Sequence, residues 1–307
     1  DRAGKFEVAD GGTFILDARA LPATSGSDEP SAFSALNQSL AAGGFDRRLD
    51  LRLREGSVTI QPEERVTAGF VRLVADTGSI DVRGSIDAVA AGGGRIELSA
   101  GGGETGTAIF LRPGSRLTAL ATDSDVTGGG EVLLDAAGAF LRFESGATID
   151  AGGGSVHIRA RRQDVFDPDG LVADTSLNMQ LEGTILGASL VEIEGVKRVE
   201  GLAEIDAAKP DAVFDPAGSR YRLSGGNIAE AIAQQAGFHF VPGYEIIGAG
   251  NLAIAGSLDL TSSRYGWEIH GRSSAADAEP GALTIRAAGD IVLSGSRNDG
   301  SPIRGNL

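Results

Sequence analysis

Short stretches in which apolar and polar residues alternate recur along the chain, and glycine-rich corners separate them. Three segments can be superposed, namely 80–98, 111–134 and 143–158. In each segment, an apolar residue is followed six positions later by another in a similar context. These pairs are Ile80 and Ile86, Leu111 and Leu117, and Phe143 and Ile149. Alternation with a period of two predicts strands with one buried face.

The second residue of each pair opens a tripeptide that leads, after a linker of variable length, to a glycine triplet. The tripeptides are Ile86-Asp87-Ala88, Leu117-Thr118-Ala119 and Ile149-Asp150-Ala151, and the triplets are Gly92 to Gly94, Gly128 to Gly130 and Gly152 to Gly154. Glycine supplies the positive φ angles that sharp corners need. A β-sandwich has no reason to repeat one corner, whereas a coil that stacks on its neighbours does. We therefore predict an all-β fold, a right-handed parallel β-helix (solenoid).

This architecture predicts one continuous stacked core. Its inward side chains alternate along the strands and recur from one repeat to the next. They are Ile86, Ile96, Leu98, Leu117, Val132, Leu134, Ile149, Val156 and Ile158.

The same alternation extends toward both ends of the chain. Near the N-terminus the alternating pairs are Phe6 and Val8, Phe14 and Leu16, Leu51 and Leu53, and Val58 and Ile60. Near the C-terminus, 250–254 and 289–293 share one pattern of glycine, polar residue and two spaced apolar residues. We therefore expect the coil to run the full length of the chain.

Three stretches interrupt the pattern. Residues 31–42, followed by Gly43 and Gly44, have apolar residues at helical spacing, and 228–235 before Gly237 predict a second short helix. We expect both helices to be insertions against the outside of the coil, and 207–219 to be a long loop. The predicted organisation is β-helix over 1–198 with a helical insertion near 31–44, a loop and short helix over 199–237, and further β-helix over 238–307.

Composition narrows the function. The net charge is −15 and no cluster of Lys or Arg stands out, which argues against nucleic-acid binding and against anionic membranes. Cysteine is absent, so disulfides and thiolate chemistry are excluded. No stretch is long and apolar enough for a membrane span. Because the chain begins at Asp1 and Met179 is its only methionine, we expect an interior piece of a longer protein.

Four segments resemble the large filamentous-haemagglutinin-like exoproteins of bacterial two-partner secretion. They are FSALNQSLAAGGF (33–45), GSIDVRGSIDA (78–88), FVPGYEIIGAGNLAIAGSLDL (240–260) and EPGALTIRAAGDIVLSGS (279–296). The resemblance implies a secreted, cell-surface adhesin or extracellular fibre, exported through an outer-membrane secretion partner. It implies a host or neighbouring-cell surface or glycan receptor as a further partner, and it supplies no active-site residues.

Candidate sites for metal or catalysis are few. Asp164, Asp167 and Asp169 precede Gly170 within seven residues, which offers oxygen ligands for calcium. The spacing matches neither the EF-hand loop nor the glycine-rich nonapeptide repeat, and it favours an ordinary polar turn. The carboxylate pairs Asp81 with Asp87 and Glu144 with Asp150 would be the acid and base of a glycan-cleaving β-helix. Scattered outward carboxylates are also what a solvated rod requires.

Histidines and aromatic residues add little. His157, His239 and His270 lie far apart in the sequence and form no metal-binding spacing. We expect Tyr265 and Trp267 to form an exposed aromatic pair in a loop, a pair that is able to stack on a sugar but is more often ordinary surface. We therefore predict a structural, adhesive rod with no catalytic residues, no cofactor and no metal, whose cut ends self-associate end to end or laterally. The alternative is a carbohydrate-active or carbohydrate-binding β-helix for acidic glycans.

Overall fold

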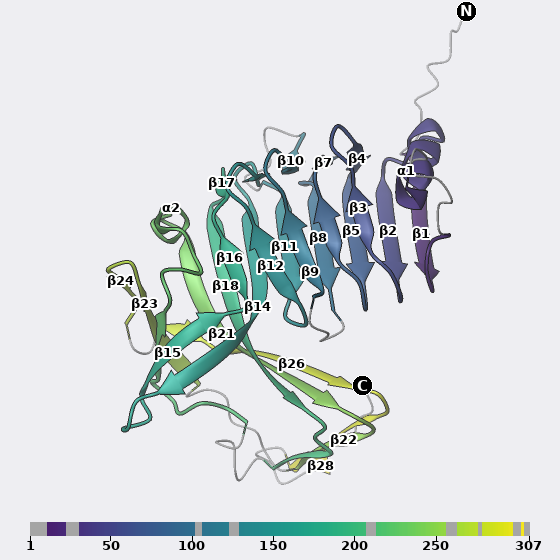
Figure 1. Cartoon of the computed structure of the whole chain (residues 1–307). Helices are drawn as coiled ribbons and strands as arrows, with labels where there is room; N and C mark the ends of the chain where they lie inside the picture. The colour runs from purple at the N-terminus through teal and green to yellow at the C-terminus, as the bar shows by residue number, and fades with distance from the viewer. Residues whose placement is uncertain are drawn as a thin grey trace, which may run out of the picture. The chain divides into compact units, whose positions relative to one another are not determined.

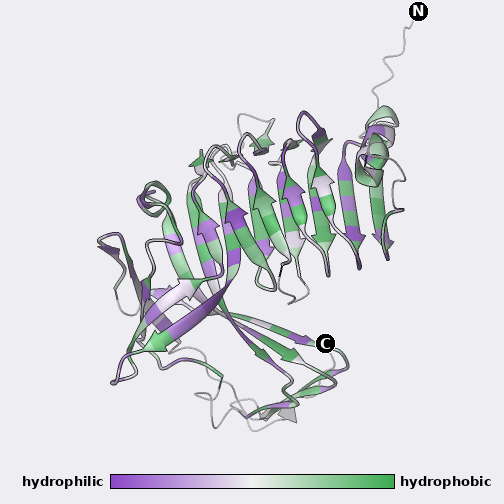
Figure 2. Cartoon of the chain, viewed as in Figure 1, coloured by the Kyte–Doolittle hydropathy of each residue, from purple (hydrophilic) through white to green (hydrophobic). Residues whose placement is uncertain are grey.

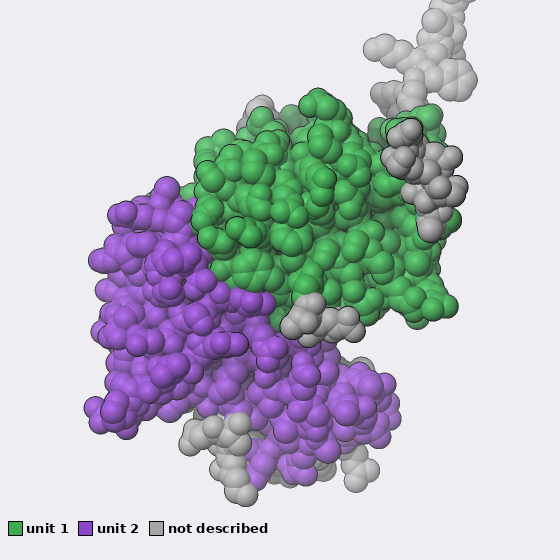
Figure 3. All heavy atoms as spheres, viewed as in Figure 1, with its two compact units in different colours: residues 1–158, 179–192, 235–238 green, residues 159–178, 193–234, 239–307 purple. Residues whose placement is uncertain are grey.

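The computed structural model describes residues 11–22, 31–101, 106–122, 129–206, 213–255, 263–275, 278–296 and 302–303. These residues form mostly β-strands with two short helices, and many of the strands pair in parallel. The chain divides into two compact units (Figure 3). Unit 1 comprises 1–158, 179–192 and 235–238, and unit 2 comprises 159–178, 193–234 and 239–307. The predicted boundaries after 198 and 237 remain a prediction.

Unit 1 contains three parallel sheets, which we call sheets A, B and C. Sheet A begins with β1 (Thr13–Ala18), β2 (Arg48–Leu53), β5 (Phe70–Ala75), β8 (Arg95–Ala100) and β11 (Glu131–Ala136). Sheet B contains β3 (Val58–Ile60), β6 (Ile80–Val82), β9 (Ala108–Leu111), β12 (Phe140–Phe143) and β16 (Met179–Leu181). Sheet C contains β4 (Arg65–Ala68), β7 (Ser85–Ala90), β10 (Arg116–Ala121), β13 (Thr148–Asp150) and β17 (Thr184–Leu186).

The chain visits these sheets in a fixed order. From β5 to β13 it passes from sheet A to sheet B to sheet C three times, and each strand pairs in parallel with the strand one passage earlier. Figure 1 shows the strands of sheet A side by side in chain order. Each passage therefore adds one strand to every sheet.

The predicted register is confirmed in sheet C, and in sheet B Phe143 lies opposite Leu111 as predicted, but the predicted position of Ile80 is wrong. Ile86 lies opposite Leu117, which lies opposite Ile149. In sheet B, however, Ile80 lies opposite Ile109, and Leu111 lies opposite Val82. The corner between Val82 and Ile86 is two residues shorter than its counterparts.

Gly84 makes this shorter corner sterically feasible. A Cβ atom on Gly84 would lie 2.4 Å from the carbonyl oxygen of Gln61 and 2.2 Å from that of Glu64. Only glycine allows such a close backbone approach.

The predicted core is confirmed. All nine side chains proposed to point inward have an exposed fraction of zero, and they lie on parallel strands rather than on two antiparallel sheets. Figure 2 shows apolar and polar residues alternating along these strands. Burial of each aliphatic side chain stabilises the fold by about 1.5–3 kcal/mol relative to exposure.

The glycine triplets are needed mainly because the backbone makes close contacts at these corners. Gly93 has a φ of +103°, as expected for a sharp corner. At Gly94 an added Cβ would lie 1.9 Å from the Ala88 carbonyl oxygen, and at Gly154 it would lie 1.8 Å from that of Gly130. Gly94 is therefore packed against its own corner, and Gly154 against the preceding corner, too tightly for a side chain at either position.

The first helix is confirmed, but its location differs from the prediction. Helix α1 spans Ala32–Ala42, Ser31 accepts a hydrogen bond from the Ser34 amide at 3.0 Å, and Gly43 ends the helix. Asn37 Nδ2 donates to the carbonyl oxygen of Arg65 at 2.9 Å, in the first strand of sheet C. Helix α1 therefore lies at the edge where sheets B and C begin.

Unit 2 mixes parallel and antiparallel strands. Strands β14 (Ser155–Phe166) and β18 (Leu190–Glu200) begin in unit 1 and continue into unit 2. Sheet D contains β15 (Val172–Leu177), antiparallel to β14, followed by β20 (Arg220–Leu223), β23 (Arg264–Ile269) and β24 (Arg272–Ser273). The short β25 (Glu279–Pro280) pairs with β23, and β18 leads through β21 (Phe238–Gly248) to β26 (Ala282–Ala287). Sheet E contains β19 (Glu204–Asp206), β22 (Leu252–Ala255), β27 (Ile291–Ser296) and β28 (Pro302–Ile303).

The two C-terminal repeats pair as their shared pattern suggests. Leu252 lies opposite Ile291 and Ile254 opposite Leu293, in parallel strands. The second helix is shorter than predicted, since α2 spans only Glu230–Ala233. Within the predicted loop, 207–212 lie outside the described residues and 213–219 contain no strand. The region 199–237 also contains β19 and β20, which were not predicted.

Candidate functional site

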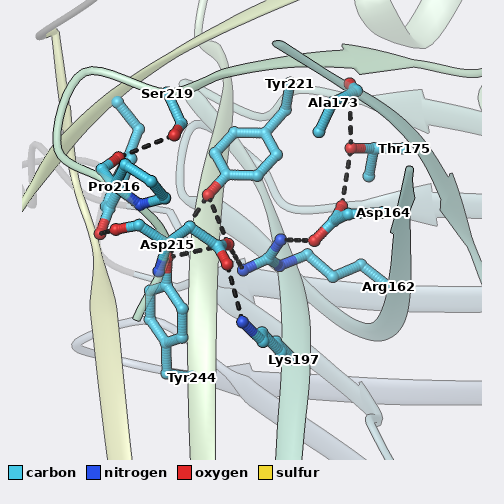
Figure 4. Close-up of polar contacts among 11 residues, drawn as sticks. Arg162, Asp164, Ala173, Thr175, Lys197, Asp215, Pro216, Ser219, Tyr221 and Tyr244 are labelled. Carbon is cyan, nitrogen blue, oxygen red and sulfur yellow. Dashed lines mark hydrogen bonds and ion pairs between the residues drawn. The ribbon is translucent and has the colours of Figure 1, made fainter. Parts of the chain in front are cut away.

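The most unusual group of side chains in unit 2 surrounds the carboxylate of Asp215 (Figure 4). Arg162 from β14 donates to it through Nη2 at 2.7 Å, and Lys197 from β18 through Nζ at 2.7 Å. The hydroxyls of Tyr221 from β20 and Tyr244 from β21 donate at 2.8 and 3.1 Å. We call these five residues the Asp215 cluster.

The Asp215 cluster is almost completely removed from solvent. The side chain of Arg162 is 0% exposed and that of Asp215 is 3% exposed, whereas Lys197, at 36%, reaches the surface. Tyr221 and Tyr244 are buried. Charges in such a place require opposite charges and hydrogen bonds, because isolated buried ions are strongly destabilising.

A second carboxylate and aromatic rings complete the surroundings of Arg162. Asp164 pairs with Arg162 Nη1 and accepts a hydrogen bond from Thr175 Oγ1 at 2.8 Å. The guanidinium carbon lies 4.8 Å from the ring centroid of Tyr221 and 5.2 Å from that of Tyr244. The faces of aromatic rings stabilise a cation electrostatically. This stabilisation is relevant to Arg162 because no hydrogen-bond partner is found for its Nε atom.

The surroundings fix the protonation states of these groups. Burial raises the pKa of Asp215, but Arg162 and Lys197 outweigh that effect and leave it below its ordinary value. Burial raises the pKa of both Tyr221 and Tyr244 above their ordinary value. At neutral pH, Asp215 is therefore an anion and both tyrosines are neutral hydrogen-bond donors.

The hydrogen bonds of Asp215 connect several strands of unit 2. A carboxylate accepts hydrogen bonds through two oxygens, and Asp215 uses both. Arg162, Tyr221 and Tyr244 donate to Oδ2, and Lys197 donates to Oδ1. The backbone is held too, because the Asp215 amide donates to Tyr244 Oη at 3.2 Å and Tyr265 Oη donates to the Asp215 carbonyl oxygen at 3.4 Å. The segment that carries Asp215 is thereby fixed to strands β14, β18, β20, β21 and β23.

The sequence pattern does not reveal this cluster. Asp164 and Tyr265 stand out in the sequence for other reasons, and Arg162 and Asp215 are 53 positions apart. One feature of the sequence could have indicated the cluster. Arg162 is a polar residue at an inward position of the alternating strand β14.

The Asp-rich segment is a turn, as the ordinary interpretation predicted. Residues 167–170 join the antiparallel strands β14 and β15, and the Asp167 amide donates to the Val172 carbonyl oxygen at 2.7 Å. Asp167 Oδ1 accepts from the Leu171 amide at 3.1 Å, while Asp169 is exposed. Among the described residues, no group of three or more His, Asp or Glu side chains could hold a metal ion.

The two carboxylates of each proposed pair have different arginine partners. Asp81 lies on β6 and pairs with Arg83 and Arg112 at 2.8 Å each, whereas Asp87 lies on β7 and pairs with Arg65. Burial raises the pKa of Asp81, but hydrogen bonds from its two arginines outweigh it and lower the pKa below the ordinary value. A carboxyl group that neighbouring cations keep in its charged form is poorly suited to donate a proton.

The second pair has the same character. Glu144 pairs with Arg112 at 3.0 Å, and Asp150 lies 3.6 Å from Arg116. These ion pairs connect neighbouring strands on the outer surface of unit 1.

The histidines have separate partners. His157 lies 3.3 Å from Glu192, and His239 lies 2.9 Å from Glu279. His270 Nε2 lies 2.8 Å from the Ile228 carbonyl oxygen. The structure does not bring the three side chains into one site.

The expectation that Tyr265 and Trp267 are exposed in a loop is wrong. Both lie on strand β23, and their exposed fractions are 0% and 4%. The ring of Tyr265 packs edge-on against that of Tyr221, with centroids 5.8 Å apart. These rings therefore contribute to the core of unit 2 and offer no flat surface to a sugar.

Two depressions in unit 2 share Arg222 and Leu223 in their lining. One also contains Glu268 and Arg272, and the other contains Val165. The guanidinium of Arg222 pairs with Glu268 at 2.5 Å and with Asp174 at 2.8 Å. Neither depression is lined by a member of the Asp215 cluster.

Comparisons with known proteins identify no relative. In the part of the chain that the structure describes, no helix has the length and apolar character to span a membrane. The resemblance to filamentous-haemagglutinin-like exoproteins therefore remains a prediction that rests on the four segments given above. No protein-family model, no curated protein and no solved structure matches the chain.

Proposed function

We propose that the chain is a stretch of right-handed parallel β-helix that serves as a rigid rod segment of a secreted bacterial surface exoprotein. The observation that carries the proposal is the fixed order in which the chain visits sheets A, B and C. A coil that climbs by one strand per passage has this topology, whereas a sandwich of antiparallel sheets does not. A right-handed coil is favoured because crossover connections between parallel strands are almost always right-handed.

The outer surface of unit 1 fits a structural role. Sheet A carries a ladder of alternating charges in which Arg72 bridges Asp50 at 3.0 Å and Glu97 at 3.2 Å. Arg48 and Arg95 also flank the ring of Phe70, at 4.6 and 5.9 Å from its centroid. Charges that are paired along the coil solvate the surface without forming a convergent site.

In this proposal the partners are those of an exported adhesin. An outer-membrane secretion partner would move the chain out of the cell, and the rod would display binding regions toward a host or neighbouring cell. The resemblance supports this assignment of partners and of cell-surface localisation. The arginine-paired carboxylates and the buried aromatic residues support the view that the segment is not an enzyme.

Lengthening the rod by whole coils tests the proposal. Arg95 lies opposite Glu131, so residues 95–130 correspond to one coil, and four tandem copies inserted after Gly130 should add about 20 Å in one dimension. We expect cooperative unfolding at an unchanged or higher temperature, with small-angle scattering showing growth along one axis only.

A matched insertion serves as the control. The same four copies with Ile96→Asp and Leu98→Asp in each should not fold, because each copy places carboxylates in the core. If the native copies unfold like the control, or enlarge the particle equally in all directions, the rod proposal is wrong.

A further inference from the structure

Sheet C of unit 1 has two edges that lie well inside the chain. Among the described strands, its first strand β4 pairs only with β7, and its last strand β17 pairs only with β13. Strand β3 precedes β4 and strand β18 follows β17. These edges therefore do not arise from the ends of the chain, and the surrounding side chains show what closes them.

At the first edge, the Arg65 carbonyl oxygen points away from sheet C. The Ser85 amide donates to the carbonyl oxygen of Glu64 at 2.9 Å, and successive residues of a strand direct their backbone groups to opposite sides. The Arg65 carbonyl therefore faces the position that a preceding strand would occupy. Asn37 Nδ2 of helix α1 donates to this oxygen at 2.9 Å, in the place of the amide of such a strand.

Further contacts hold helix α1 in this position. Ser34 Oγ and Asn37 Nδ2 donate to the carboxylate of Glu64 at 2.9 and 3.2 Å. Both donors are buried, as are Phe33 and Leu40 on the same helix. Asparagine is a weak helix former, because its side chain competes with the helix for backbone hydrogen bonds. Its presence on the buried face of α1 is explained by the strand carbonyl that it contacts.

The last strand of sheet C is closed in the same way. The Thr184 amide donates to a carbonyl beside β13 at 3.0 Å, and the Leu186 carbonyl accepts from an amide there at 3.1 Å. The Ile185 carbonyl between them therefore faces away from the sheet. Gln235 Nε2 donates to this oxygen at 3.1 Å. At each edge of sheet C, a side-chain amide thus occupies the place of a missing strand.

We propose that Asn37 and Gln235 are end caps that close sheet C against any further strand. An open sheet edge is a template for strand addition, and solenoids cover their ends with capping elements. The occupied carbonyls, together with helix α1 at the first edge, prevent another coil or a second polypeptide from extending the sheet. Sheet C thereby stops at five strands, and a rod that continues beyond these caps continues without sheet C.

Hydrogen exchange followed by mass spectrometry tests the two caps separately. Asn37→Leu removes the donor at similar volume and favours the helix, since leucine is the better helix former. The amide hydrogens of β4 should then exchange about tenfold faster than in the native chain, because this edge opens locally, while those of β17 keep their native rate. Gln235→Leu should have the reverse effect. In sedimentation velocity, both variants should self-associate at lower concentration than the native chain.

Gln38→Leu is the matched control, because Gln38 is next to Asn37 in helix α1 but is exposed. It should change neither exchange nor association. The proposal is overturned if both cap variants keep the native exchange rates in β4 and β17, or if Gln38→Leu acts like Asn37→Leu. If Asn37→Leu does not fold, Asn37→Ala gives the same comparison without a large apolar side chain.

This inference rests on the coil of the proposed function and adds where one of its sheets stops. The two proposals can fail separately. Native exchange rates in the cap variants would leave the rod proposal intact, because the inserted coils test that proposal.

Discussion

Units 1 and 2 fill their interiors in different ways. In unit 1 the inward positions hold aligned aliphatic residues such as Ile86, Leu117 and Ile149, and the charges pair outside. In unit 2 an arginine and an aspartate lie in the interior among tyrosines. The aliphatic stack needs no partner beyond its neighbours, whereas the buried ion pair depends on hydrogen bonds from Lys197 and two tyrosines to Asp215.

The difference follows from topology. Unit 1 repeats one parallel register, so each aliphatic residue meets a similar one in the next strand. In unit 2 the antiparallel pair β14 and β15 interrupts that repetition, and large side chains take the place of the stack. Gly195 illustrates the fit, because an added Cβ would lie 2.7 Å from the ring of Phe240.

The largest effect should come from placing a charge in the aliphatic stack. Ile149→Asp in unit 1 should lower the free energy of unfolding by about 5 kcal/mol, because an unpaired carboxylate would lie between packed layers. Urea unfolding followed by circular dichroism measures this. Leu186→Asp is the control, since Leu186 is 45% exposed, and a similar loss there would show that burial is not the cause.

Breaking the buried ion pair should have the next largest effect. Asp215→Ala leaves Arg162 buried without its main counter-charge and should lower the free energy of unfolding by about 3–5 kcal/mol. Tyr221→Phe removes one hydrogen bond to the same carboxylate and should cost about 1 kcal/mol. Equal losses for the two variants would mean that packing, rather than charge, dominates the cluster.

The contribution of Asp215 to the stability of the fold should depend on pH only under acidic conditions. Its pKa in the folded chain lies below the ordinary value of 3.8, so the unfolded chain binds the proton first as the pH falls. The stabilisation is therefore constant between neutral pH and about pH 5, and it is lost progressively below pH 3.8. The difference in unfolding free energy between the native chain and Asp215→Ala should follow this course. A difference that shrinks between pH 8 and pH 5 would contradict it.

The outer ladder should contribute least. Arg72→Gln removes the bridge between Asp50 and Glu97, yet the Arg72 side chain is 37% exposed, and such pairs contribute about 0–1 kcal/mol. The loss should nearly vanish at about 1 M salt, where the screening length is about 3 Å. Unfolding at low and high salt tests this, and a salt-independent loss above about 2 kcal/mol would place the ladder on a par with the interior cluster.

The sequence predicted unit 1 far better than unit 2, because unit 1 repeats itself. Alternation and recurring glycine triplets were sufficient to assign the inward residues and the register of sheet C. In sheet B, Leu111 and Phe143 were matched correctly, but Ile80 was misplaced by two residues, since a corner can shorten at Gly84 without changing the alternation. This error left the assignment of inward residues intact.

The Asp215 cluster could not be predicted in the same way. Its members come from distant strands, and none of them repeats. The burial of Tyr265 was likewise hidden, because tyrosine suits both a core and a surface and only the pairing of β23 with β20 decides between them. Contacts between non-repeating residues depend on topology, which local patterns do not contain.

Cross-linking in all three sheets would test the coil most directly. The chain has no cysteine, so introduced pairs are unambiguous. Three facing pairs are Arg72 with Glu97 in sheet A, Asp81 with Phe110 in sheet B, and Arg116 with Thr148 in sheet C. Facing residues in neighbouring strands are close enough for a disulfide. Each pair changed to cysteine should form an intramolecular disulfide under mild oxidation, whereas the shifted pair of Arg72→Cys with Ser99→Cys should not. Efficient linking in only one sheet, or equal linking of the shifted pair, would contradict the coil.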